Sequence, residues 1–251
     1  MLPTGGFSVL ASKPKVGKST LARNLALCTA KGEFFLNKAV NKGAVIYYAL
    51  EEKKAEVKRH FRDMGAAGDE EIYIYAGSAP VDALIQIKEV TELLKPALII
   101  IDPLFRLTRV RDGNDYAAVT QALEPLLRLA RDTGTHVLCV HHTGKGDRQG
   151  GDSVLGSTAI FSSVDTLMIM KRHENYRTVH TIQRYGKDLE ETTLHFDKDA
   201  RTISIGKSKQ EEDLTTLSDA IMEFLSSQSE PFTEPVIMED IEGRTGLKRK
   251  A

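Results

Sequence analysis

The chain has 251 residues and a net charge of −1, with 41% hydrophobic and 27% charged residues, which is ordinary for one large α/β domain with a small appendage. This balance excludes a polycationic DNA-binding protein, and no apolar run is long enough to cross a membrane. Two cysteines in apolar segments and the lack of a signal-peptide pattern predict a cytoplasmic protein without a membrane partner.

Strands and helices are predicted to alternate through the first 142 residues. Strands are expected at 7–11, 44–50, 72–76, 97–101 and 135–142, and helices at 19–31, 53–64, 81–94 and 116–133. Such alternation predicts an α/β fold with a mostly parallel sheet and helices on both faces. The run ALIII at 97–101 is typical of a strand that is buried on both faces.

The pattern changes after residue 163. Short strands are expected at 166–170, 178–184, 192–196 and 202–205, as an antiparallel extension of the same sheet. We therefore predict an ATPase-type domain at 1–205, a charged linker at 206–213 and a small helical piece at 214–251. The last piece resembles the beginning of a winged helix that stops before its wing, so we expect a fragment of a longer protein.

The strongest motif is SKPKVGKS at residues 12–19, between the first strand and the first helix. It fits the P-loop pattern G-x-x-x-x-G-K-[ST], except that Ser12 replaces the first glycine. Backbone N–H groups and the helix dipole would bind phosphate oxygens, Lys18 would face the β- and γ-phosphates, and Ser19 would bind Mg²⁺. The predicted ligand is ATP with Mg²⁺, and its predicted contacts are Ser12, Lys13, Pro14, Lys15, Val16, Gly17, Lys18, Ser19 and Thr20.

Polar residues follow the neighbouring predicted strands. Asp102 closes ALIII and would hold Mg²⁺. Glu51 is the chosen carboxylate for activating water, with Glu52 as the alternative, since we expect their strand to lie beside the P-loop strand. His141 and His142 end a further strand, and His142 is the better candidate for sensing the γ-phosphate.

These segments together resemble the RepA-type hexameric helicases, which belong to the RecA/DnaB-like ATPases. The resemblance is carried by SKPKVGKST, GAVIYYALEE, LIIIDPLFRL and VLCVHHTGKG, and it covers roughly residues 5–205. It implies a RecA-like fold, with Glu51 activating water, Asp102 holding the metal and His142 as sensor.

The resemblance also implies a ring, usually hexameric, with ATP at the subunit junctions. A basic residue on a late hairpin would then reach the nucleotide of the neighbouring subunit. The segment QRYG makes Arg184 the candidate finger and Lys187 a weaker one. The family commonly has a lysine two residues before the arginine, and Ile182 stands there instead.

Two basic loops follow the strands that end at Asp102 and His142. In RecA-like proteins such loops line the path of single-stranded DNA, and phosphate contacts there would be blind to sequence. Their predicted DNA-contacting residues are Arg106, Arg109, Arg111, Lys145 and Arg148. We therefore expect a replicative-type helicase of a plasmid, phage or other mobile element. The alternatives are a regulatory ATPase of the KaiC or RadA kind and an ATP-switched DNA-binding regulator.

Overall fold

A computed structural model of the chain describes residues 2–110, 112–113, 115–143, 157–173, 176–227 and 233–247. Within these residues, nine strands form one sheet in the order β3-β2-β4-β5-β1-β6-β7-β8-β9. The strands are β1 (Phe7–Ser12), β2 (Val45–Ala49), β3 (Ile72–Ala76), β4 (Leu98–Asp102), β5 (His136–His142), β6 (Thr166–Arg172), β7 (Arg177–Gln183), β8 (Thr192–Phe196) and β9 (Ile203–Ser208). The predicted α/β fold is confirmed.

Eight helices connect or follow these strands in the described part of the chain. They are α1 (Lys18–Lys31), α2 (Lys54–Asp63), α3 (Ala83–Leu94), α4 (Leu104–Thr108), α5 (Tyr116–Thr133), α6 (Ser157–Ser163), α7 (Lys209–Ser227) and α8 (Glu234–Thr245). The short helices α4 and α6 were not predicted, because neither is long enough to show a helical repeat of apolar residues. None of the described helices has the length and apolar character of a membrane span.

The parallel half of the sheet contains β1 to β6. β1 pairs with β5 on one side and with β6 on the other, and both pairings are parallel. The expectation that β2 lies beside β1 is wrong, because β4 and β5 stand between them and β2 pairs with β3 and β4. Strand adjacency depends on how the crossovers wind, which apolar patterning alone does not determine.

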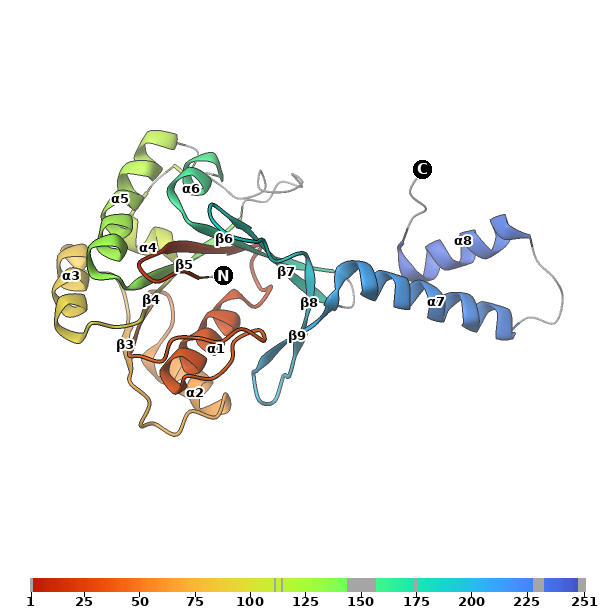
Figure 1. Cartoon of the computed structure of the whole chain (residues 1–251), viewed down its shortest axis with the longest axis horizontal. Coiled ribbons are helices and arrows are strands. Elements are labelled where there is room, and N and C mark those ends of the chain that lie inside the picture. Colours follow the sequence, from red (N-terminus) through yellow and green to blue (C-terminus); the bar gives the residue numbers. More distant parts are fainter. Residues whose placement is uncertain are drawn as a thin grey trace.

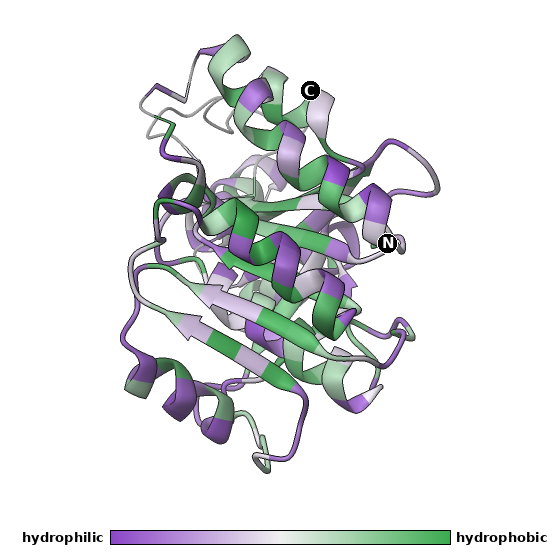
Figure 2. Cartoon of the chain, turned by 90° about the vertical axis from the view of Figure 1, so that its left-hand side faces the viewer, coloured by the Kyte–Doolittle hydropathy of each residue, from purple (hydrophilic) through white to green (hydrophobic). Residues whose placement is uncertain are grey.

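Helices cover both faces of this half, as Figure 1 shows. One core layer joins α3, α4, α5 and α6 to the sheet, with Ile87, Leu104 and Leu123 among its fully buried residues. The other layer joins α1 and α2 to the opposite face, with Leu21 and Phe61 among its members. Figure 2 shows hydrophobic residues along the strands and a mixture of hydrophobic and hydrophilic residues along the helices that cover them.

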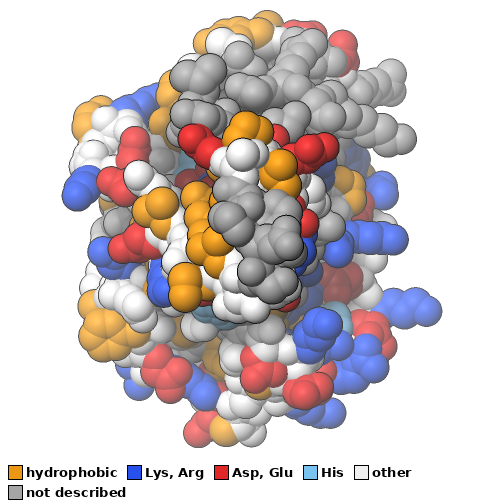
Figure 3. Space-filling model, turned by 90° about the vertical axis from the view of Figure 1, so that its right-hand side faces the viewer, with side chains coloured by type: hydrophobic (Ala, Val, Ile, Leu, Met, Phe, Trp, Pro, Cys, Tyr) orange, Lys and Arg blue, Asp and Glu red, His pale blue; other side chains and the backbone are white. Residues whose placement is uncertain are grey.

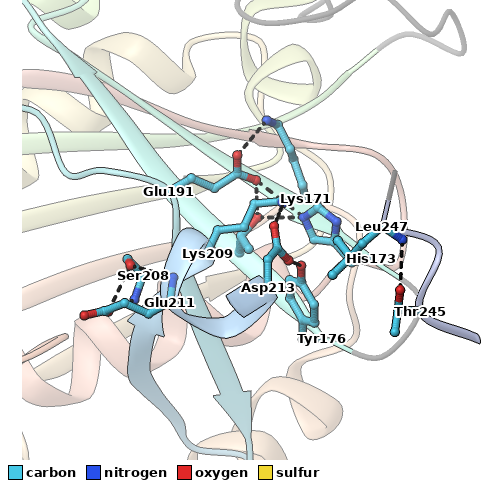
Figure 4. A network of polar contacts seen from close by, with 11 residues as sticks. Lys171, His173, Tyr176, Glu191, Ser208, Lys209, Glu211, Asp213, Thr245 and Leu247 are labelled. Carbon is cyan, nitrogen blue, oxygen red and sulfur yellow. Dashed lines mark hydrogen bonds and ion pairs between the residues drawn. The ribbon is translucent and has the colours of Figure 1, made fainter. Parts of the chain in front are cut away.

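The antiparallel half runs from β6 through β7 and β8 to β9, as predicted. Residues 206–213, predicted as a linker, instead form the end of β9 and the first residues of α7. A polar network fastens α7 to the strands (Figure 4), in which Tyr176 donates a hydrogen bond to Asp213 at 2.7 Å and Lys209 pairs with the same carboxylate. The charged residues that suggested a linker are therefore anchoring contacts.

α7 and α8 pack against each other and project from the sheet (Figure 1). α8 ends at Thr245 with Gly246 in the left-handed conformation, and the segment after Leu247, where a recognition helix was expected to begin, lies outside the described residues. Figure 3 looks at this end of the molecule, where hydrophobic side chains lie among charged ones. Met222 and Leu225 are among the exposed hydrophobic residues, at 62% and 52%.

Candidate nucleotide site

The P-loop connects the end of β1 to the start of α1. Gly17 has φ 110°, a left-handed conformation that residues with a Cβ rarely adopt, and it stands directly before the helix. A Cβ at Gly17 would lie 2.7 Å from the ring of Phe196 at the end of β8. Glycine is therefore required here both by the turn and by the close approach of the antiparallel half.

Lys18 lies folded against its own loop. Its Nζ donates hydrogen bonds to the carbonyl oxygens of Ser12 and Lys13, at 3.0 and 3.1 Å, and to the Ser12 hydroxyl at 3.0 Å. Burial lowers the pKa of Lys18 to about 8, and the nearby Asp102 carboxylate opposes that shift. Ser12 thus supplies an acceptor that the usual glycine would lack. A triphosphate would offer the ammonium stronger, charged acceptors.

The carboxyl ends of β2, β4, β5 and β1 meet at one edge of the sheet. Ala49 of β2 is level with Asp102 of β4, and His142 of β5 is level with Ser12 of β1. Glu51 therefore lies beyond β2, next to Asp102, while His142 lies next to the P-loop. Although β2 is not beside β1, the structure brings the predicted catalytic side chains of these strands to one edge.

Asp102 is 7% exposed and lies between two hydroxyl donors. Tyr47 donates to Asp102 Oδ2 at 2.8 Å, and Ser19 donates a second hydrogen bond. Burial raises the pKa of Asp102, while the hydrogen bonds from Ser19 and Tyr47 and the charge of Arg23 counteract the shift. The carboxylate is therefore held in a fixed orientation beside the hydroxyl of the P-loop.

This donor set fits Mg²⁺, which prefers oxygen ligands and keeps several waters. Ser19 and Asp102 would supply the protein oxygens, and phosphates and water the others. Among the described residues, no cluster of three or more His, Cys, Asp or Glu side chains forms another metal site.

The two adjacent glutamates have different surroundings. Glu51 Oε1 accepts a hydrogen bond from Arg106 Nε at 2.7 Å, and both side chains are largely exposed. Glu52 instead forms an ion pair with Arg23, which is 3% exposed, and lies 3.6 Å from His60 Nδ1. Glu52 therefore belongs to a partly buried structural network, which favours Glu51 as the carboxylate that is free to orient water.

His142 lies within electrostatic range of the other site residues. Burial and the charge of Lys18 lower its pKa, while Glu51 and Asp102 raise it. The neutral imidazole can therefore accept or donate a hydrogen bond near the loop. His141 is 3% exposed and packs against Phe105, with ring centroids 4.7 Å apart. Of the two histidines, His142 is the one with an exposed side chain at this edge.

Arg184 lies at the opposite edge of the sheet. Its backbone N–H donates to Asp165 O at 2.8 Å, and Asp165 Oδ2 accepts from the N–H of Phe7, the first residue of β1. The P-loop follows the last residue of β1, about 16 Å away along the strand. Neither Arg184 nor Lys187, which stands in the same exposed turn, contacts the nucleotide loop of its own chain. The finger assignment stays a prediction that requires a second subunit.

The predicted DNA-contacting residues are only partly described. Arg106 is 65% exposed and pairs with Glu51. Arg109 caps α4 and donates hydrogen bonds to the carbonyl oxygens of Ala79 and Pro80, at 3.0 and 3.2 Å. Arg111, Lys145 and Arg148 lie outside the described residues.

Sequence reasoning missed three residues around the site. Tyr47 and Arg23 look like ordinary members of an apolar strand and a surface helix, yet both are buried. The ring of Phe196, which touches Gly17, also carries the Arg177 guanidinium at 4.1 Å. A hydroxyl within the apolar run VIYYA was the one available signal, since a buried phenol needs a hydrogen-bond partner.

Comparisons with known proteins agree with this geometry. A family model described as an AAA domain matches residues 1–148. The solved ATPase domain of a DnaB-like helicase is similar to the chain with a TM-score of 0.63 and 17% sequence identity, covering 80% of this chain and 85% of that one. At that identity the likeness shows a shared fold. No sequence among the curated proteins matches the chain.

Proposed function

Because the chain belongs to the family of AAA domains and has the fold of a known ATPase domain, we propose that it hydrolyses ATP with Mg²⁺ to act on single-stranded DNA. One observation carries the proposal. Lys18 of the P-loop, Asp102, Glu51 and His142 come from four separate segments and meet at one edge of the sheet. Structural packing alone does not require two acids, a lysine and a histidine there.

Each of these residues has a distinct task in the proposed reaction. The P-loop amides and Lys18 bind the phosphates, while Ser19 and Asp102 hold the magnesium ion, which when bound neutralises developing charge on the phosphate oxygens. Glu51 orients the attacking water and accepts its proton. His142, next to the P-loop, forms or loses a hydrogen bond as the γ-phosphate is present or absent.

Among the described residues, Lys18 is the fixed cation that the chain directs toward its own γ-phosphate. An arginine from a second subunit would supply the charge that stabilises the transition state. Arg184 is exposed at the far edge of the sheet, which is where a residue serving a neighbour's site has to be. We therefore propose assembly into a ring, with a hexamer as the expected size and the cytoplasm as its location.

Action on DNA is supported by the position of Arg106, which follows the metal-binding strand directly and pairs with Glu51. A phosphate bound there would lie beside the hydrolytic site. We propose a helicase of the kind found in plasmids, phages and other mobile elements.

The test is the ATPase rate with and without single-stranded DNA, together with displacement of an annealed strand. A helicase should show stimulation and strand displacement, both abolished when EDTA removes Mg²⁺. ATP hydrolysis with neither property would favour a regulatory ATPase. Preference for one duplex sequence at moderate salt would favour a DNA-binding regulator. Absence of ATP binding would overturn the proposal entirely.

A further inference from the structure

A buried tyrosine holds the carboxylate assigned to the metal. Tyr47 stands in the middle of β2 with no exposed surface, and its hydroxyl donates to Asp102 Oδ2 at 2.8 Å. The two residues lie on paired strands, since β2 and β4 run side by side. A phenylalanine would fill the same apolar space, so the hydroxyl needs a reason other than packing.

The Tyr47 ring is fixed from two sides. The edge of Phe61 meets it, with ring centroids 5.8 Å apart and an interplanar angle of 88°. The Arg23 guanidinium lies 5.6 Å from the ring centroid. A ring restrained in this way can direct its hydroxyl in only a narrow range of orientations.

Arg23 is itself held by groups on the neighbouring elements. It pairs with Glu52 and donates a hydrogen bond to His60 Nδ1 at 2.8 Å. Asp102, Tyr47, Arg23 and Glu52 therefore form a continuous chain of contacts, of which the first three members are buried. This chain ends at the carboxylate that also accepts a hydrogen bond from the P-loop residue Ser19.

We propose that Tyr47 is a positioning residue for the magnesium ion: it fixes one oxygen of Asp102 so that the carboxylate presents its remaining lone pairs to the metal beside Ser19. The inference rests on the proposed function, because it assumes that the chain binds nucleotide with Mg²⁺. Tyr47 does not touch the nucleotide or the metal, and acts through Asp102. Burial and the Asp102 charge raise the pKa of Tyr47 well above its usual range, so its hydroxyl remains a donor.

The hydroxyl matters because Asp102 is buried. Without it the carboxylate loses a donor, turns more freely, and is harder to keep charged in the metal-free protein. A hydrogen bond to a charged group is strong enough that its loss should weaken Mg²⁺ binding about tenfold. Nucleotide binding without Mg²⁺ depends on the P-loop and should stay unchanged.

The experiment measures Mg²⁺ binding separately from hydrolysis. The fluorescent analogue mant-ADP is bound to the full chain in EDTA to obtain its metal-free affinity, and Mg²⁺ is then titrated into the complex. Mn²⁺ binding followed by electron paramagnetic resonance gives a second, nucleotide-independent readout. The variants are Tyr47→Phe and, as matched control, Tyr48→Phe, whose ring packs against Tyr75 instead.

Tyr47→Phe should keep the metal-free affinity within about twofold and raise the apparent Mg²⁺ dissociation constant about tenfold, while Tyr48→Phe leaves both unchanged. Incorporating 3-fluorotyrosine at position 47 keeps the donor and should restore Mg²⁺ affinity. If Tyr47→Phe binds Mg²⁺ like the unmodified chain, or loses metal-free affinity equally, the positioning role is overturned. If the unmodified chain binds no nucleotide, the proposed function itself fails, which is a different result.

Discussion

The parallel and antiparallel halves of the sheet hold their functional residues in different ways. β1 and β4 are buried along their whole length, and the side chains that follow β2, β4 and β5 meet above them. In β7 and β9, buried residues are interspersed with partly or fully exposed ones, and Arg184 lies in an exposed turn. The parallel half thus builds most of a nucleotide site alone, whereas the antiparallel half presents residues that need a second subunit to act.

The largest effect should come from Lys18→Ala, in the parallel half. The variant removes the fixed charge that faces the phosphates, so ATP hydrolysis should fall by more than about a thousandfold, to background. Steady-state ATPase measurements check this, with Lys15→Ala in the exposed part of the same loop as control. Retained turnover in Lys18→Ala would show that the loop does not bind the triphosphate as described.

Arg184→Ala tests the antiparallel half. Because Arg184 lies at the opposite end of β1 from its own P-loop, the variant should keep full ATP affinity yet lose turnover by about a thousandfold. The exposed Lys187, in the same turn, gives the control variant Lys187→Ala. Mixing Lys18→Ala with Arg184→Ala subunits should recover partial activity, since some junctions would then combine an intact loop with an intact finger. No recovery would argue against a shared site.

Glu51→Gln should reduce hydrolysis about a hundredfold while ATP still binds, because the amide cannot accept a proton from water. Glu52→Gln is the matched control, one residue along the chain. It should instead weaken the Arg23 network and lower the melting temperature, with a smaller effect on turnover. A reversed pattern, with Glu52→Gln inactive and Glu51→Gln active, would exchange the two assignments.

Local sequence pattern predicted the strands of the parallel half closely. Unbroken apolar runs such as the one ending at Ile101 have one favourable environment, and the P-loop motif marks where the sheet binds phosphate. The pattern did not predict which strands are neighbours, so β2 was wrongly placed beside β1. Adjacency arises from contacts between segments far apart in sequence, which a single sequence does not reveal.

Buried polar partners were equally hard to foresee. Nothing near Tyr47 in the sequence identifies Asp102, 55 positions away, as its acceptor. Charged residues at 206–213 suggested a linker, but Asp213 accepts a hydrogen bond from Tyr176 and pairs with Lys209. Charge alone therefore does not distinguish a solvated segment from one whose ions have specific partners.

A smaller effect is expected from Arg106→Gln, which separates the two roles meeting at Glu51. The variant removes the ion pair that holds Glu51 in the absence of DNA, so the DNA-free ATPase rate should rise about twofold to fivefold. Affinity for single-stranded DNA, measured by fluorescence anisotropy, should fall and become less sensitive to salt. Unchanged DNA affinity with altered turnover would confine Arg106 to the ATPase site.

The smallest effect on nucleotide binding should come from Phe224→Ala in α7. Phe224 is 4% exposed and, with Ala220 and Ile241, forms the buried side of the α7–α8 pair, so its truncation should destabilise that pair by about 3 kcal/mol. Hydrogen exchange should then accelerate in α7 and α8 and remain slow in β1, β4 and β5, with mant-ADP affinity unchanged. Leu225→Ala, at an exposed neighbouring position, should change neither. Equal acceleration in the parallel strands would show that the projecting helices and the nucleotide site unfold as one unit, and would remove the distinction between the two halves.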